Sequence, residues 1–109
     1  MNIDFSPNCR KKLAEIKRKN LILFSLISKQ LFSFQQNPNN HSLRLHKLKG
    51  KLSQSWSISV SKSIRMVFYY RQVDGEKRAV FILIGTHNEV YIYRSFTLNL
   101  REFQNHNQK

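Results

Sequence analysis

The fold is decided by residues 79–93, AVFILIGTHNEVYIY. Apolar residues fill both alternating positions from Val80 to Ile84, which predicts a strand covered on both faces in the interior of a sheet. The run ends at Gly85, where the absence of a side chain permits a bend or the close approach of another segment. His87 follows, and imidazole is the side chain whose unperturbed pKa lies nearest neutrality. The stretch therefore predicts an interior strand that delivers a histidine at its end.

The chain carries a large excess of positive charge. Its 109 residues suit a single domain with one core, and they carry a formal net charge of +13. No carboxylate occurs between Glu15 and Asp74, and the cations of that interval are Lys17, Arg18, Lys19, Lys29, Arg44, Lys47, Lys49, Lys51, Lys62, Arg65 and Arg71. Such a surface predicts a polyanionic partner: nucleic acid first, an acidic protein second, an anionic membrane surface third.

Several classes of function are disfavoured by composition. Paired-carboxylate hydrolysis and magnesium-dependent phosphoryl transfer both need clustered acidic groups, which this chain lacks. Cys9 is the single cysteine, so no intrachain disulfide and no thiolate zinc site is expected, as fits a reducing cytoplasm. The histidines show no paired helical spacing, the N-terminus is no signal peptide, and residues 21–34 are too few to span a bilayer. We expect a cytoplasmic protein that uses no metal and no cofactor.

The first part of the chain predicts a strand and a helical hairpin. Ile3 and Phe5 alternate with polar neighbours, and Ser6-Pro7 is a helix-start signal with serine as the N-cap. Asn20 marks a tight break. A second helix is expected over residues 21–36, ended by Asn37-Pro38, and two helices so close in sequence form an antiparallel pair.

The remaining segments predict an antiparallel sheet. Residues 43–48 suit a short strand or extended arm, residues 56–60 alternate apolar residues with serines, and residues 64–71 alternate again. Asp74-Gly75 is a type I′ hairpin signal that joins residues 64–71 to the interior strand. The expected class is α+β, with the helical hairpin on one face of a twisted antiparallel sheet of four to five strands. The opposite face is expected to be open and to present Arg65, Tyr69 and the serines.

Metal-free cleavage of RNA is one chemistry that the chain could support. It requires a base for the ribose 2′-OH, cations for the crowded phosphorane and an acid for the leaving oxygen. The candidates for these roles are His46, Arg65, His87 and Tyr91. Candidates for RNA binding, which uses cations beside aromatic rings, are Lys47, Lys49, Lys51, Lys62, Tyr69 and Arg71. The same residues also fit ordinary roles as loop histidines, solvated cations and packed aromatics, so composition favours nucleic-acid binding and leaves enzyme activity open.

Four segments in order carry a resemblance to a known family: LHKLKG at 45–50, WSISV at 56–60, RMVF at 65–68 and IGTHNEVY at 84–91. Together they resemble the RelE/ParE superfamily of type II toxin–antitoxin toxins, and most nearly the YafQ-like and RelE/StbE-type mRNA interferases. The resemblance extends from about residue 3 to residue 93. It suggests a RelE-like domain over residues 1–94 with the element order β-α-α-β-β-β-β, followed by a partly disordered C-terminal extension over residues 95–109.

The resemblance implies a toxin that enters the ribosome and cleaves mRNA there, and that a cognate acidic antitoxin holds inactive. Operator DNA is then a partner only through the antitoxin complex. By position, His46 and His87 match the histidines of the YafQ-like pattern, with His87 as general acid. Arg65 matches the phosphate-stabilising arginine, Tyr91 the C-terminal catalytic or stacking aromatic, and Lys47 and Lys49 the basic segment used on RNA.

The sequence also departs from that family. Ser59 and Ser63 stand where YafQ-like toxins carry a histidine and an aspartate, and the segment beyond Arg94 is long for the family. Two other functions remain open: a non-catalytic poison of DNA gyrase, as in the ParE branch, and a catalytically decayed RNA-binding homologue. The gyrase alternative predicts inhibited supercoiling with intact transcripts.

Overall fold

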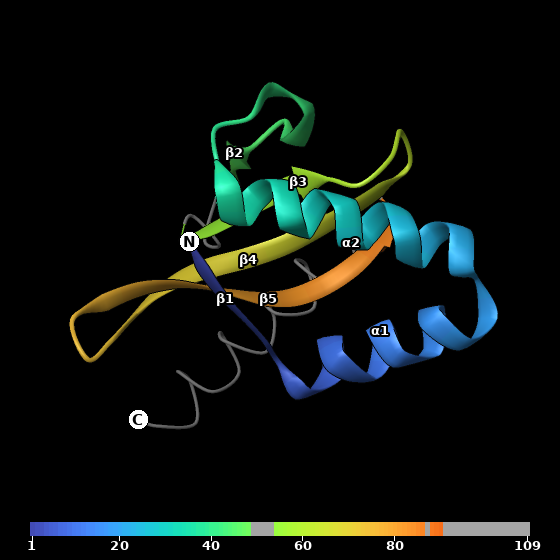
Figure 1. Ribbon diagram of the computed structural model, residues 1–109, viewed down its shortest axis with the longest axis horizontal. Helices are drawn as coiled ribbons and strands as arrows, with labels where there is room; N and C mark the ends of the chain where they lie inside the picture. The colour runs from blue at the N-terminus through green and yellow to red at the C-terminus, as the bar shows by residue number, and fades with distance from the viewer. Residues whose placement is uncertain (49–53, 87, 91–109) are drawn as a thin grey trace, which may run out of the picture.

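The structure is a computed structural model, and it describes residues 1–48, 54–86 and 88–90. Its elements follow the expected order: β1 (Asn2–Phe5), α1 (Pro7–Lys19), α2 (Leu21–Gln36), a 3-10 turn (His41–Leu43), β2 (His46–Lys47), β3 (Ser55–Ser59), β4 (Ile64–Val73) and β5 (Glu76–Thr86). Figure 1 shows the two helices side by side over one face of the sheet, with the β4–β5 hairpin extending beyond them. The predicted α+β class, with the helical hairpin on one face of the sheet, is confirmed. The predicted extension over residues 95–109 lies outside the described residues.

Polar residues set the ends of both helices. Ser6 is the N-cap of α1, where its Oγ accepts a hydrogen bond from the Cys9 amide at 3.2 Å, and Pro7 takes the first helical position. Asn20 ends α1 and caps α2, since its Oδ1 accepts a hydrogen bond from the Leu23 amide at 3.1 Å. Among the described residues, no helix is long and apolar enough to cross a membrane.

The sheet has the strand order β1-β5-β4-β3-β2. Strands β2 to β5 pair antiparallel, as expected, but β1 runs parallel to β5, so the sheet is mixed. The alternation of Ile3 and Phe5 predicts a strand without reporting its direction. A parallel neighbour needs a long crossover, and the helical hairpin and the strands after it provide one here.

Two local features shape the β4–β5 pair. Asp74 and Gly75 both have positive φ, 52° and 78°, as the predicted type I′ turn requires. Further along, Phe68 pairs with Phe81 while its neighbour Val67 pairs with Leu83, so Ile82 is the extra residue of a β-bulge. The bulge shifts the alternation by one residue. It explains why β5 is apolar at both parities, with Phe81 and Ile84 both in the core beneath the helices.

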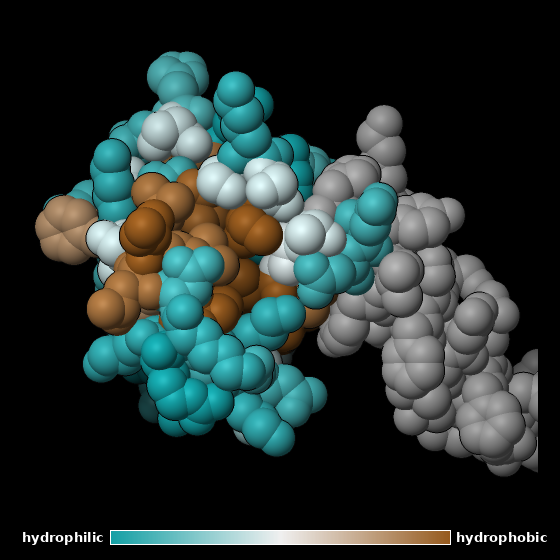
Figure 2. Space-filling view, turned by 90° about the vertical axis from the view of Figure 1, so that its right-hand side faces the viewer, coloured by the Kyte–Doolittle hydropathy of each residue, from teal (hydrophilic) through white to brown (hydrophobic). Residues whose placement is uncertain are grey.

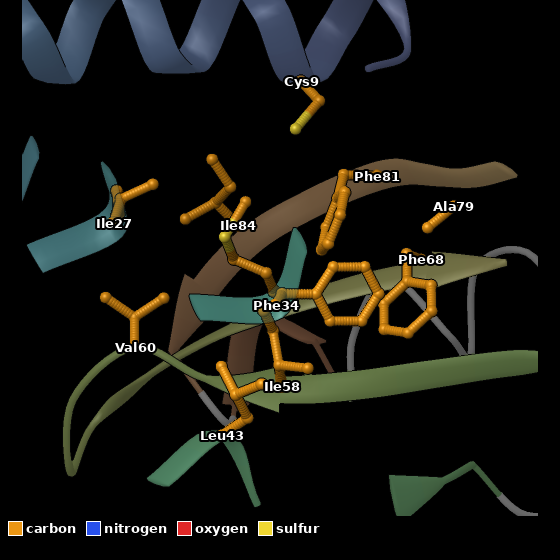
Figure 3. Packing of buried hydrophobic residues seen from close by; sticks show 11 residues of the cluster. Cys9, Ile27, Phe34, Leu43, Ile58, Val60, Phe68, Ala79, Phe81 and Ile84 are labelled. Carbon is orange, nitrogen blue, oxygen red and sulfur yellow. The ribbon is translucent and has the colours of Figure 1, made fainter. Parts of the chain in front are cut away.

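Three phenylalanine rings join the helix layer to the sheet (Figure 3). The ring centroid of Phe34 on α2 lies 5.0 Å from that of Phe68 on β4 and 5.5 Å from that of Phe81 on β5. The Phe68 and Phe81 centroids are 4.9 Å apart, and all three side chains are fully buried. Around them pack the other core residues, which include Cys9, Ile27, Leu43, Ile58, Val60, Met66, Ala79 and Ile84.

We expect Phe34→Ala to destabilise the domain by about 3–5 kcal/mol, because it removes a fully buried ring and leaves a cavity. Phe32→Ala on the same helix is the matched control. Its ring is 65% exposed, so the change in unfolding free energy should stay within about 0.5 kcal/mol. Urea unfolding of both variants measures this, and equal effects would contradict the ring cluster as the main link between the layers.

Candidate functional site

The sheet face turned away from the helices carries two of the predicted catalytic residues. His46 pairs with Ser57, and Ser59, two residues further along β3, pairs with Arg65. Residues directly opposite each other, and residues two apart on one strand, share a face. His46 and Arg65 therefore project from the same face, with Cα atoms about 12 Å apart by the usual strand spacing and rise.

His46 is exposed on the edge strand β2. Its Nδ1 lies 3.2 Å from the carbonyl oxygen of Arg44. A carbonyl only accepts, so Nδ1 is the donor of this contact and the neutral ring keeps its lone pair on Nε2. Arg44 has a left-handed backbone with φ 47°, which belongs to the turn that presents this carbonyl. His46 is thus held in the tautomer that can accept a proton at Nε2.

Arg65 is half-buried on β4. Its Nη1 is buried and has no hydrogen-bond partner within the described ranges, and the same is true of the Ser57 Oγ. A buried polar group without a partner costs about 1–3 kcal/mol, and more if it is charged. A phosphate oxygen would satisfy a guanidinium N–H in this position with a charge-assisted hydrogen bond.

The middle of this face differs from the open surface expected from the sequence. Ser55, Ser57 and Val67 are buried, and Arg65 and Tyr69 are half-buried rather than freely presented. Val67 pairs with Leu83 and Tyr69 with Val80, so an apolar strip runs through the middle of the face. The expectation of a hydroxylated, solvent-facing surface was wrong for these serines, because alternation identifies a face without showing what shields it.

The other predicted RNA-binding residues divide between the two faces. Tyr69 and Arg71 lie four and six residues after Arg65 on β4, so they share its face of the sheet. Lys62 is exposed in the turn between β3 and β4. Lys47 pairs with Trp56, on the opposite face from its neighbour His46, and its Nζ lies 6.0 Å from the Trp56 ring centroid. Lys47 and His46 therefore project from opposite faces of the sheet, since adjacent strand residues point to opposite faces.

The structure adds one residue that the sequence analysis missed. Glu89 accepts a hydrogen bond from the Thr86 amide at 3.1 Å, and the Thr86 Oγ1 accepts one from the Glu89 amide at 3.2 Å. This is a capping box, and residues 88–90 are helical. The signal was present in the sequence as a threonine followed three residues later by a glutamate.

Glu89 lies close to the strand residue opposite Arg65. That residue is Gly85, where a Cβ would lie only 3.0 Å from the Cβ of Glu89. The hydrogen bonds to Thr86 hold the pKa of the Glu89 carboxyl below its usual range, with the Lys12 ammonium 3.4 Å away as a lesser cause. An ionised carboxylate therefore stands beside Gly85, the strand residue paired with Arg65.

Four predicted site residues lie outside the described residues: His87, Tyr91, Lys49 and Lys51. Their roles stay predictions. Within the described ranges, no group of three or more metal-ligating side chains is positioned to hold an ion.

Comparison with known proteins identifies structural neighbours. No protein-family model and no curated protein matches the sequence. The YoeB/ParE toxin from Agrobacterium tumefaciens is 17% identical, with a TM-score of 0.67 over 80% of this chain and 99% of that one. YoeB in the heterotetrameric YoeB–YefM toxin–antitoxin complex from Staphylococcus aureus is 22% identical, with a TM-score of 0.62 over 80% and 97%. YafQ from E. coli is 20% identical, with a TM-score of 0.56 over 83% and 97%.

We expect the capping box to make stability depend on pH through Glu89. Its folded pKa lies below the ordinary 4.5, so the carboxylate contributes stability above pH 4.5 and loses this contribution as the pH falls through the folded value. Glu89→Gln should lower the melting temperature at pH 7, and the difference from wild type should shrink below pH 4.5.

Thermal unfolding across this pH range measures the effect. Glu15→Gln is the matched control, because Glu15 makes an exposed helical ion pair with Lys19 at 3.3 Å and no other ion pair among the described residues. If the difference in melting temperature between Glu89→Gln and wild type does not vary with pH, the ionised Glu89 carboxylate does not stabilise the capping box.

Proposed function

We propose that this chain, which has the fold of the RelE/YoeB type II toxins, is itself such a toxin and cleaves mRNA on the ribosome without a metal. The single observation that carries the proposal is the Nη1 of Arg65, which is buried, lacks a hydrogen-bond partner among the described residues, and belongs to a side chain on the same sheet face as His46. A guanidinium held without an acceptor among the described residues is suited to a phosphate. The fold likeness to YoeB and YafQ and the net charge of +13 support the same reading.

The proposed reaction begins at His46. Its Nε2 takes the proton of a ribose 2′-OH, and the oxygen attacks the adjacent phosphorus. Arg65 stabilises the charge that builds on the phosphorane oxygens. The bond from phosphorus to the 5′-oxygen breaks, and this oxygen takes a proton from the general acid, the role predicted for His87. The products are a 2′,3′-cyclic phosphate and a 5′-hydroxyl, and Tyr91 is the predicted aromatic contact to a base.

The proposed partners follow from the positive charge of the chain and from its structural neighbours. Lys62, Tyr69 and Arg71 would contact the RNA, together with Lys49 and Lys51, which follow β2 in the sequence. YoeB from S. aureus forms a heterotetramer with YefM, a toxin–antitoxin complex. We infer a corresponding acidic antitoxin for this chain, with contact to operator DNA only through that complex, and action in the cytoplasm.

We expect Arg65→Ala to reduce mRNA cleavage by about 10²-fold or more, which is the usual effect of removing one donor to transition-state charge. The measurement is induced expression followed by mapping of transcript 5′ ends and growth. Arg10→Ala, an exposed arginine of α1, is the matched control and should cleave like wild type.

The melting temperature of the variant distinguishes loss of the site from loss of the fold. Arg65→Ala should melt at or above the wild-type temperature, because it removes a buried donor that lacks a partner in the described chain. Unchanged growth arrest and unchanged 5′ ends in a folded Arg65→Ala variant would overturn the proposal. Intact transcripts with inhibited DNA supercoiling would favour a gyrase poison, and RNA binding without cleavage a decayed homologue.

RNA affinity should fall steeply with salt, because each neutralised phosphate of a single strand releases about 0.7 of a counterion. Lys62→Ala and Arg71→Ala should each reduce the slope of log affinity against log salt by about that amount. Titration of a fluorescent RNA at several salt concentrations measures the slope, with Arg10→Ala as control. A flat salt response in wild type would contradict an interface dominated by phosphates.

A further inference from the structure

The loop between α2 and β2 encloses a small polar pocket beside β2, which is an edge strand of the sheet. The pocket has a volume of about 180 Å³ and is lined by Asn39, Asn40, His41, Arg44 and Leu45. We call these five residues the loop pocket. Figure 2 shows mostly hydrophilic residues over the upper end of the molecule, the end at which Figure 1 shows this loop.

Hydrogen bonds commit one of the lining side chains to the loop itself. The Asn40 Oδ1 accepts a hydrogen bond from the Ser42 amide at 3.1 Å, and the Asn40 Nδ2 donates one to the Ser33 Oγ at 2.9 Å. Three other lining side chains form no hydrogen bond or ion pair with a described residue, and these are Asn39, His41 and Arg44. An amide, an imidazole and a guanidinium are therefore available to a ligand.

The backbone of Arg44 supports a role for its side chain. Its φ and ψ are both 47°, a left-handed conformation that glycine adopts freely and that residues with a Cβ adopt at a cost. Among the described residues, the other non-glycine residue with positive φ is Asp74, in a hairpin turn where aspartate is a usual choice. Stability alone would favour glycine or asparagine at position 44. An arginine in a strained backbone is a reason to look for a function of its side chain.

The described lining of the loop pocket contains no carboxylate. No acidic residue occurs between Glu15 and Asp74 in the sequence, and Glu15 is paired with Lys19 on α1. A guanidinium can donate two parallel hydrogen bonds to phosphate oxygens. An anion that enters the pocket therefore meets Arg44 without competition from an acidic lining residue.

The backbone of the loop pocket contacts the ring of His46. The carbonyl oxygen of Arg44 lies 3.2 Å from the His46 Nδ1, and Leu45 directly precedes His46 in the chain. The pocket thus adjoins the residue that would take the proton of the ribose 2′-OH. An RNA strand bound at His46 meets the loop pocket where it passes the β2 edge of the sheet.

We propose that the loop pocket is an RNA subsite that binds the phosphate of a nucleotide next to the scissile one. Arg44 is the phosphate ligand, and the Asn39 amide and the His41 ring contact the sugar or the base. This inference rests on the proposed function. Phosphates, hydroxyls and base edges of single-stranded RNA match these three groups. An acidic peptide fits less well, because Leu45 is the one apolar residue in the described lining and peptides ordinarily bind in longer apolar grooves.

The first test measures the affinity of the full chain for a fluorescent, mixed-sequence single-stranded RNA whose 2′-O-methyl groups prevent cleavage. Arg44→Gly removes the guanidinium, keeps the carbonyl that contacts His46 and suits the left-handed backbone. We expect about 10-fold weaker binding or more, as for loss of one charge-assisted contact. The slope of log affinity against log salt should fall by about 0.7, the value for one phosphate. Arg10→Ala, exposed on α1, should bind like wild type.

Two further readouts distinguish a lost contact from a damaged fold or a damaged catalytic group. Arg44→Gly should melt a few degrees above wild type, because glycine relieves the left-handed backbone. With a cleavable RNA, Arg44→Gly should raise KM and leave kcat close to the wild-type value, whereas Arg65→Ala should lower kcat.

A cysteine footprint locates the RNA independently. Cys9 is the single cysteine and is buried, and burial raises its pKa to about 11, so it reacts slowly with maleimides. Asn39→Cys should be labelled in the free chain and protected when the 2′-O-methyl RNA is bound. Ala14→Cys, exposed on α1, should be labelled in both states.

The outcomes separate this inference from the proposed function. Wild-type affinity and salt slope in a folded Arg44→Gly variant, no RNA binding by wild type, or labelling of Asn39→Cys that RNA does not change overturns the subsite, whether or not the chain cleaves mRNA. Protection of Asn39→Cys by the protein of the adjacent reading frame, and not by RNA, assigns the pocket to an acidic protein and also overturns the subsite. RNA binding that depends on Arg44 without any mRNA cleavage leaves the subsite standing and overturns only the enzyme activity.

Discussion

The contact among the rings of Phe34, Phe68 and Phe81 is the interaction on which the rest of the structure depends. The three rings come from α2, β4 and β5, so one cluster joins the helix layer to the two longest strands. Aromatic rings bury large areas and prefer edge-on and tilted arrangements, which fixes orientation as well as distance. With the helices held on one face of the sheet, the polar residues of β3 and β4 are left to the other face.

The β-bulge at Ile82 connects this core to the candidate site. Without the extra residue, the alternation that buries Phe81 would turn Ile84 away from the helices. With it, Ile84 stays in the core, Leu83 faces Val67, and Gly85 faces Arg65. The same irregularity thus completes the hydrophobic core and puts a residue without a side chain opposite the guanidinium. Glu89 uses the space at Gly85, which brings its carboxylate to that end of the sheet.

The two surfaces of interest lie on opposite sides of the molecule and differ in chemistry. The sheet face combines His46 with buried, unpartnered polar atoms of Ser57 and Arg65 within the described ranges, an arrangement suited to a small anionic group. The outer side of α2 carries exposed apolar side chains next to the basic last turn of α1.

Local signals in the sequence determined most of the order and the ends of the helices and strands. Ser6-Pro7, Asn20 and Asp74-Gly75 act through hydrogen bonds and backbone angles within a few residues, so their effects can be read without knowing the fold. The one-sided charge is likewise a property of composition. Only the tertiary structure decided the parallel direction of β1, the bulge at Ile82, the burial of Ser57 and the separation of Lys47 from His46. Each of these depends on which distant strand lies alongside, because register and shielding arise from pairing between segments far apart in the chain.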